Sequence, residues 1–255
     1  MSGVPGLTDA ATIHLVETSP VLREAQRKTL PGSEVVWHSS IAEIPPGALL
    51  LVANEFFDAL PVRQFVRAGN SWQERVVGLI DGKLGFGLGP GRLDNGPVGP
   101  ERSLLEIRPA ADGIIAEISG RLNEHSGAAL LIDYGHAAST PGETLQAVRR
   151  HAYVDPLDSP GEADLTAHVD FAALARTAQA AGLAVHGPLT QGEFLLSLGL
   201  LERAGRLGAT ASDKERENIR AAVERLAAPE QMGRLFKAMA LTRAGLSLPP
   251  FTPGI

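Results

Sequence analysis

An uninterrupted apolar run that ends in a cluster of polar residues constrains this chain most. Leu49 to Ala53 are all aliphatic, and Asn54, Glu55 and Asp58 follow within a few residues. Such a run is typical of a strand buried on both faces of a parallel sheet. Open parallel sheets bind ligands just beyond the carboxyl ends of their strands, where these three polar side chains fall. A helix cap explains only one or two of them, so the segment predicts a functional site on an α/β fold.

Strand and helix patterns alternate around this run. Ile13 to Val16 predicts a strand, after which Ser19 and Pro20 predict the N-cap and first residue of a helix. Further strands are expected at 34–37, 128–132, 147–154 and 183–185, and helices near 114–122 and 171–181, the latter capped by Asp170. The rest of the segment 136–169 has no clear pattern, and a loop of that length is often functional. The alternation favours a parallel sheet flanked by helices.

Residues 62–92 differ, because they contain short strand-like runs typical of an antiparallel insertion. Asp81 and Gly82 separate two of these runs, which is a strong hairpin signal. The glycines at 85–91 have the spacing of a phosphate loop. However, no buried strand precedes them and no helix follows. We therefore expect a flexible loop that continues to Pro100.

The carboxyl-terminal part, residues 190–245, is expected to be helical. Thr190 with Glu193, and Ser212 with Glu215, each form the pattern of a capping box. A last helix is expected to begin at Pro229 and to run past Met239.

Composition argues against several classes of function. A formal net charge of -6 gives no electrostatic footprint for nucleic acid, and no apolar run is long enough to span a bilayer. The absence of cysteine rules out disulfides and thiolate nucleophiles and fits a reducing compartment, so cytoplasm is the expected location. The seven histidines have no compact ligand spacing, and we expect no metal site.

Other polar residues also follow predicted strands. Glu17 ends the first strand, and an acidic residue there commonly accepts hydrogen bonds from ribose hydroxyls, although a solvated or capping carboxylate is the alternative. Asp133 and Tyr134 follow the strand 128–132. Parallel strands would bring Glu17, the Asn54 cluster and Asp133 to one edge of the sheet. His168 either orients a substrate or hydrogen-bonds locally.

Five blocks of sequence occur in the order found in one enzyme family. They are Val16 to Arg23, Ala53 to Pro61, Leu131 to Gly135, Asp164 to Phe171 and Thr190 to Leu195. Together they closely resemble the MidA-like family of class I S-adenosylmethionine-dependent methyltransferases, which includes a mitochondrial protein arginine methyltransferase that assists assembly of respiratory complex I. The resemblance spans roughly residues 13–201. It implies a Rossmann-like class I sheet in a single domain, residues 13–255, with the antiparallel insertion and carboxyl-terminal helices described above.

The resemblance also implies roles for the candidate residues. Glu17, Ser19 and Asn54 would contact S-adenosylmethionine, with Glu17 on its ribose. Asn54, Glu55 and Asp58 would be catalytic, with the carboxylates orienting an arginine guanidinium through charge-assisted hydrogen bonds. The substrate-binding candidates are Asp133, Tyr134 and His168. By resemblance the acceptor is a protein, such as a subunit of complex I, and the compartment in a eukaryote is the mitochondrial matrix.

The sequence departs from the family at its amino end. The family has a strand, a glycine-rich loop and a helix ahead of the ribose-binding acid, and Met1 to Thr12 are too few residues to supply them. We therefore expect a sheet that lacks its first strand and glycine-rich loop, and a truncated domain that binds cofactor poorly. Two alternatives remain: a non-catalytic assembly or binding protein that keeps the family surface, and another nucleotide-dependent α/β enzyme such as an oxidoreductase.

Overall fold

The computed structural model describes residues 6–30, 34–94 and 96–251, and the chain divides between Ala48 and Leu49 into two compact units. In the first unit, β1 (Ile13–Val16) and β2 (Val35–His38) form a parallel two-stranded sheet. The remaining elements are α1 (Leu7–Ala10), α2 (Pro20–Thr29) and the short 3₁₀ helix η1 (Ile41–Glu43). Ser19 caps α2 as predicted, because its Oγ accepts a hydrogen bond from the N–H of Leu22. The single-domain boundary 13–255 stays a prediction.

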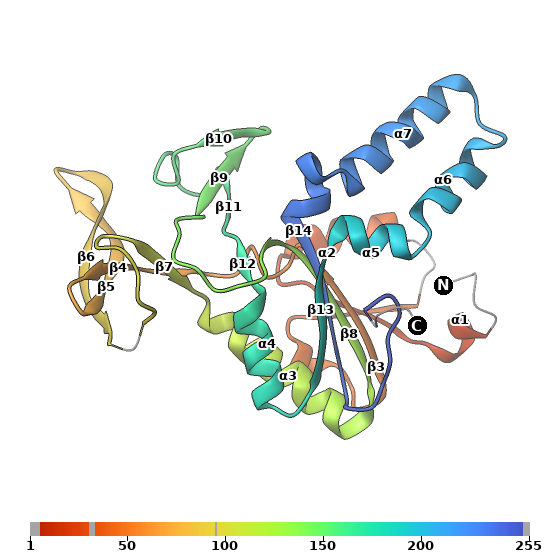
Figure 1. Cartoon of the computed structure of the whole chain (residues 1–255), viewed down its shortest axis with the longest axis horizontal. Helices are drawn as coiled ribbons and strands as arrows, with labels where there is room; N and C mark the ends of the chain where they lie inside the picture. Colours follow the sequence, from red (N-terminus) through yellow and green to blue (C-terminus); the bar gives the residue numbers. More distant parts are fainter. Residues whose placement is uncertain (1–5, 31–33, 95, 252–255) are drawn as a thin grey trace. The chain divides into compact units, whose positions relative to one another are not determined.

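A five-stranded sheet forms the centre of the second unit (Figure 1). Its strands are β3 (Leu49–Asn54), β8 (Gly127–His136), β12 (Val169–Asp170), β13 (Ala184–Thr190) and β14 (Phe236–Thr242). β3 runs parallel to β8, with Leu49 opposite Gly127 and Asn54 opposite Ile132. β14 lies antiparallel between β8 and β13. The mixed α/β class is therefore confirmed, and the sheet contains both parallel and antiparallel neighbours.

Two helices, α3 (Pro109–His125) and α4 (Phe171–Ala180), lie side by side against this sheet (Figure 1). Ile115 and Leu122 of α3 and Phe171 of α4 are fully buried, which makes this side the core of the second unit. Asp170 caps α4 as predicted, because its Oδ1 accepts from the N–H of Ala173 at 2.9 Å.

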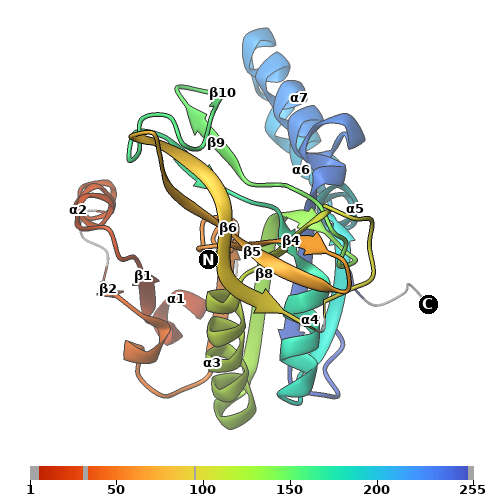
Figure 2. The same cartoon turned by 90° about the vertical axis from the view of Figure 1, so that its left-hand side faces the viewer.

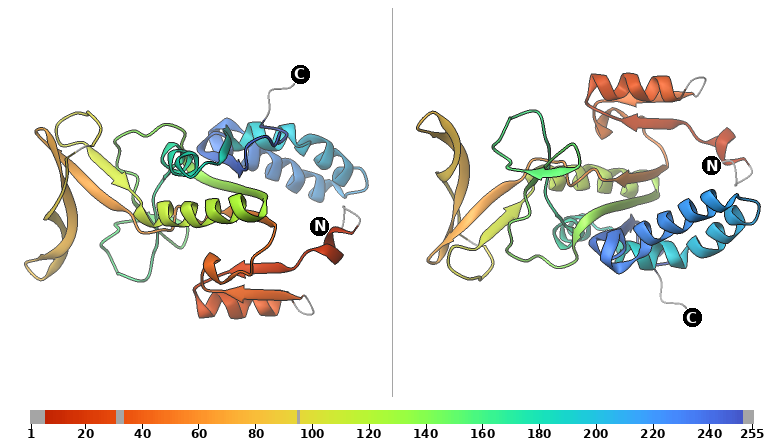
Figure 3. Two further views of the ribbon diagram at one scale, coloured as in Figure 1. Left: turned by 90° about the horizontal axis from the view of Figure 1, so that it is seen from below. Right: turned by 90° about the horizontal axis from the view of Figure 1, so that it is seen from above.

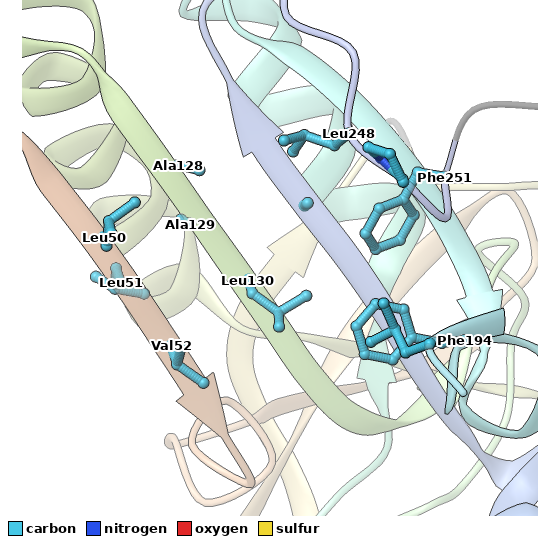
Figure 4. A pocket seen from close by; sticks show the side chains of 12 residues that line it. Leu50, Leu51, Val52, Ala128, Ala129, Leu130, Phe194, Leu248 and Phe251 are labelled. Atoms are coloured by element: carbon cyan, nitrogen blue, oxygen red, sulfur yellow. The ribbon is translucent and has the colours of Figure 1, made fainter. Parts of the chain in front are cut away.

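One face of β3 is half-buried and the other is exposed, contrary to our expectation of burial on both faces. Leu50 and Val52 are 74% and 70% exposed, although the strand is entirely aliphatic up to Ala53. They line an open apolar pocket of about 240 Å³ with Leu130 of β8 and Phe251 (Figure 4). An apolar run shows that a segment favours burial, but it does not show which other element, if any, covers each face of the strand.

The antiparallel insertion is larger than predicted. It contains β4 (Arg63–Ala68), β5 (Ser71–Ile80), β6 (Lys83–Leu93) and β7 (Leu104–Ile107) in the sheet order β6-β5-β4-β7. Figure 2 shows this sheet from the side of β5 and β6. Phe65, Trp72 and Leu105 form its own apolar cluster. The Asp81-Gly82 turn is confirmed, and both residues have the positive φ that a two-residue hairpin turn requires.

The glycine-rich segment 85–91 belongs to β6, so the strand-like run expected at 83–87 is confirmed and the expectation of a flexible glycine loop is wrong as far as Leu93. A Cβ on Gly85 or on Gly89 would approach the side chain of Ile80 or of Val76 to 2.7 Å. Side chains of β5 thus lie over these glycines, and spacing alone does not reveal such cross-strand packing.

The segment predicted as one strand, 147–154, is a hairpin of two. β9 (Gln146–Arg149) pairs antiparallel with β10 (Ala152–Val154) and with β11 (Asp164–Thr166). Arg150 and His151 form the turn with positive φ, which no glycine or asparagine announces in the sequence.

The helix predicted from Thr190 past Leu201 is broken at Gly199, which has a positive φ, into α5 (Gln191–Ser197) and α6 (Leu200–Gly208). The helix predicted after Ser212 is present as α7 (Asp213–Ala227), and α6 and α7 lie side by side (Figure 3). Both capping boxes are confirmed. The prediction of a last helix from Pro229 past Met239 is wrong. The π-helical turn η2 (Pro229–Gly233) occupies its first residues, and Phe236–Thr242 form the strand β14. Six of the seven residues of β14 are buried, and a short apolar run of this kind fits either a strand or a helix.

Candidate active site

The exposed part of the candidate site is Asn54 and Glu55, at the carboxyl end of β3. The N–H of Glu55 donates to the carbonyl of Ile132 at 2.9 Å, and the Asn54 amide donates to Glu55 Oε1 at 3.3 Å. Glu55 has φ 49°, a left-handed conformation that costs a non-glycine residue about 1 to 2 kcal/mol. Such strained positions cluster at functional sites, where the surrounding structure holds them.

A buried carboxylate supports the backbone that follows Glu55. Asp133 of β8 is fully buried, and its Oδ2 accepts from the N–H groups of Phe56, Phe57 and Asp58 at 3.2, 3.0 and 3.2 Å. Its Oδ1 accepts from the N–H of Tyr134 at 2.9 Å. All of these hydrogen bonds come from main-chain amides, so Asp133 positions the loop and does not face the solvent.

Asp58 lies in the interior close to Asp133, with only 5% of its surface exposed. Burial, followed by the negative charge of Asp58, raises the pKa of Asp133 to about 7 and outweighs the amide hydrogen bonds that lower it. Within the described part of the chain, Asp58 Oδ1 has no hydrogen-bond partner. The Asp58 side chain is therefore buried, whereas those of Asn54 and Glu55 are exposed to solvent.

Tyr134 and His168 join this buried cluster. Burial raises the pKa of the Tyr134 hydroxyl, and the nearby Asp58 carboxylate raises it further. Its ring meets that of His168 edge to face, with centroids 5.6 Å apart. Burial and the neighbouring His136 lower the pKa of His168, which favours the neutral imidazole. The structure thus brings together Asp58, Asp133, Tyr134 and His168, which the sequence analysis singled out separately.

Two residues of this region have no counterpart in the sequence analysis. Arg108 donates to the carbonyls of Asp58, Leu60, Ala167 and His168 at distances of 2.9 to 3.5 Å. Glu106 accepts from Gln64, from the N–H groups of Thr144 and Leu145, and from the Thr144 hydroxyl. The sequence around Arg108 shows only that the residue precedes Pro109, where a helix begins. The role of Arg108 could not be predicted, because hydrogen bonds to main-chain groups do not require a recognisable sequence motif.

Glu17 belongs to the first unit, at the carboxyl end of β1. Its Oε1 accepts from the N–H of Ser19 at 2.8 Å, and among the described residues its Oε2 has only a long contact of 3.5 Å with Gln26 Nε2. A half-exposed carboxylate with this spare acceptor capacity fits a ribose diol. The Ser19 hydroxyl is engaged as the cap of α2.

The described residues contain no His, Cys, Asp and Glu cluster suited to a metal ion. None of the helices in the described ranges is long and apolar enough to cross a membrane.

The chain matches known proteins over most of its length. The family model "Putative S-adenosyl-L-methionine-dependent methyltransferase" matches residues 2–189. The chain is 35% identical over 263 residues to the mitochondrial protein arginine methyltransferase NDUFAF7 homolog of Caenorhabditis elegans, covering 90% of this chain and 60% of that protein. For NDUFAF7 of Homo sapiens the identity is 32%, covering 90% and 58%. The chain thus spans about 60% of the length of these curated relatives.

A solved structure is also similar. The crystal structure of a COG1565 superfamily member from Burkholderia thailandensis bound to S-adenosyl-homocysteine superimposes with a TM-score of 0.80 at 28% identity, covering 91% of this chain and 64% of that one. The predicted resemblance is confirmed by these matches. The chain belongs to the S-adenosylmethionine-dependent methyltransferase family that contains the NDUFAF7 proteins.

Proposed function

We propose that this chain carries the acceptor side of a methyltransferase that modifies arginine side chains of a protein. The observation that carries the proposal is Glu55, an exposed carboxylate in a strained left-handed conformation at the carboxyl end of β3, above the loop that Asp133 supports. The names of the NDUFAF7 relatives support an arginine acceptor. By analogy, a subunit of respiratory complex I is a candidate substrate.

In this proposal Glu55 accepts hydrogen bonds from the acceptor guanidinium and draws its positive charge away from the attacking nitrogen. Asn54 orients the Glu55 carboxylate through its amide. When bound, S-adenosylmethionine supplies a methyl group already activated by its sulfonium. The bond from a guanidinium nitrogen to the methyl carbon would form as the carbon–sulfur bond breaks, S-adenosyl-homocysteine would be the leaving group, and the proton of that nitrogen would pass to the Glu55 carboxylate or to solvent. The interior cluster next to this loop fixes the backbone that follows Glu55 and so supports the acceptor site. Its members are Asp58, Asp133, Tyr134 and His168.

For the cofactor, we propose Glu17 as the ribose ligand, with Ser19 fixing its carboxylate through the main-chain N–H. We further propose that the first strand and glycine-rich loop of the family sheet are missing from the described residues. Ahead of β1 these residues form only α1 as regular structure, β1 pairs only with β2, and β3 has a ladder partner only in β8. The proposed compartment is the cytoplasm, or the mitochondrial matrix in a eukaryote.

Isothermal titration with S-adenosylmethionine and S-adenosyl-homocysteine, followed by mass spectrometry of methylated arginine peptides, tests this proposal. We expect product with the wild type and none with Glu55→Gln. Glu217→Gln, which removes an exposed carboxylate of α7, is the matched control. If neither this chain nor a version extended by the upstream part of a relative binds either compound, the proposed function is wrong.

A non-catalytic assembly role is the second candidate. Outer residues of the β5–β6 hairpin leave a cross-strand apolar face exposed: Val77, Leu79, Leu84 and Leu88 are 51%, 74%, 40% and 57% exposed. Exposed apolar patches commonly mark protein interaction sites. Methylated product that depends on Glu55 would count against a purely structural role.

A further inference from the structure

The loop Phe56–Leu60 lies between a buried anion, Asp133, and a half-buried cation, Arg108. On the amide side, Asp133 accepts three of its N–H groups. On the carbonyl side, Arg108 donates from Nε to Leu60 at 3.2 Å and from Nη2 to Asp58 at 3.5 Å. Three peptide groups of the loop therefore direct their N–H ends at a carboxylate, and two others direct their C=O ends at a guanidinium, which together stabilise one backbone conformation.

The same guanidinium ties this loop to a second segment. Arg108 donates from Nη2 to Ala167 at 2.9 Å and from Nη1 to His168 at 3.2 Å. The N–H of Ala167 in turn donates to the carbonyl of Asp58 at 3.1 Å. Arginine suits this place because its planar fork offers five donors, whereas a lysine ammonium is a compact charge with three.

Three carboxylates near Arg108 favour its charged form. Burial lowers its pKa, and the nearby carboxylates of Glu106, Asp133 and Asp58 oppose that effect. Its described hydrogen bonds all go to main-chain carbonyls, so the carboxylates stabilise the cation at a distance and leave the fork free to hold backbone.

We propose that Arg108 is the positioning residue of this loop: with Asp133 it holds the backbone that follows Glu55 and so keeps Glu55 in its left-handed conformation, facing an acceptor. That Glu55 faces an acceptor rests on the proposed function. That Arg108 and Asp133 fix the conformation of the loop does not rest on it, because this follows from their hydrogen bonds to main-chain groups.

Hydrogen exchange of single amides tests the hold directly. In the wild type the N–H groups of Phe56, Phe57 and Asp58 should exchange slowly, because Asp133 accepts all three. Arg108→Lys keeps the charge but loses the fork, and should speed their exchange about tenfold, with Arg108→Met giving a larger effect. Arg216→Lys is the matched control, because Arg216 also donates to a carbonyl, that of Gly208 at 3.0 Å. It should leave these amides unchanged.

Unchanged exchange at the three amides in Arg108→Lys would overturn the proposal, and that variant decides the matter even if Arg108→Met does not fold. Methyl transfer supplies the second readout: Arg108→Lys should lower kcat about tenfold while the KM for S-adenosylmethionine stays constant. An equal loss in Arg216→Lys would mean a general loss of structure and would also overturn it. If the wild type transfers no methyl group, the proposed function fails, while the exchange rates still decide the role of Arg108.

Discussion

Replacing Asp133 with asparagine should remove a large pH dependence from the stability of the second unit. Burial and the charge of Asp58 raise the pKa of Asp133 from 3.8 to about 7. Between these values the folded protein holds a proton that the unfolded chain releases. The free energy of unfolding therefore falls as the pH rises from about 4 to about 7, and is then independent of this group.

The size of the effect follows from the shift. From pH 5 to pH 8 the wild type should lose about 2 to 3 kcal/mol of stability through this one group. Asparagine has the same shape but does not titrate. It leaves at least one of the four N–H groups bound by Asp133 without an acceptor, at a pH-independent cost of about 1 to 3 kcal/mol. Relative to wild type, Asp133→Asn should thus gain about 2 to 3 kcal/mol between pH 5 and pH 8.

Urea unfolding followed by circular dichroism at pH 5, 6, 7 and 8 measures this difference. Asp213→Asn is the control, because the Asp213 side chain on α7 is fully exposed. A stability difference that does not vary with pH would refute the reasoning. A difference that moves against Asp133→Asn as the pH rises would show that the four amide hydrogen bonds outweigh burial and the charge of Asp58.

Four further changes test other parts of the structure by unfolding measurements. Glu55→Gly should raise the free energy of unfolding by about 1 kcal/mol, because glycine adopts φ 49° without strain; a decrease would contradict this. Trp72→Ala should cost about 3 to 5 kcal/mol, because the indole is 99% buried and donates to Pro97, and a loss below 1 would argue against this core. Thr190→Ala should cost about 1 kcal/mol through loss of the capping box, seen as a lower urea midpoint. Gly135→Ala should lower the melting temperature most, because its Cβ would meet the Val169 carbonyl at 2.0 Å; a variant as stable as wild type would contradict this close approach.

Features set by neighbours a few residues away were predictable from the sequence. Ser19, Asp170, Thr190 and Ser212 cap helices as expected, because a cap needs only its own side chain and the next turn. The Asp81-Gly82 turn was predictable, because a two-residue hairpin turn needs positive φ at both positions and few residue pairs adopt it as readily as Asp-Gly.

Features set by distant partners were not predictable in the same way. β14 was expected to be helical, because its apolar residues do not reveal that β8 and β13 lie on either side. Leu50 and Val52 were expected to be buried, because the apolar run does not show which face of β3 lacks a covering helix.

The candidate site shows both outcomes. Polar residues near strand ends located its centre, since Asp58 and Asp133 do meet, and Tyr134 and His168 do pack together. The predicted strand end at 132 was wrong, because β8 continues to His136 and contains Asp133 and Tyr134. The division of the site residues into exposed and buried members was not predictable, because it depends on the loop that Arg108 holds. All the functional roles expected of these residues stay predictions: the catalytic role of Asn54, Glu55 and Asp58, the cofactor contacts of Glu17, Ser19 and Asn54, and the substrate contacts of Asp133, Tyr134 and His168.

The position of β14 has a consequence for the order in which this protein folds during synthesis. β8 carries Asp133, and β13 leads into α5. In the part of the chain that the structure describes, these two strands are joined only through β14, whose residues 236–242 leave the ribosome after both. The nascent chain must therefore keep a gap in the middle of its sheet until residue 242 is available. Loop closure over about a hundred residues then completes the sheet, a non-local step that is slow by nature.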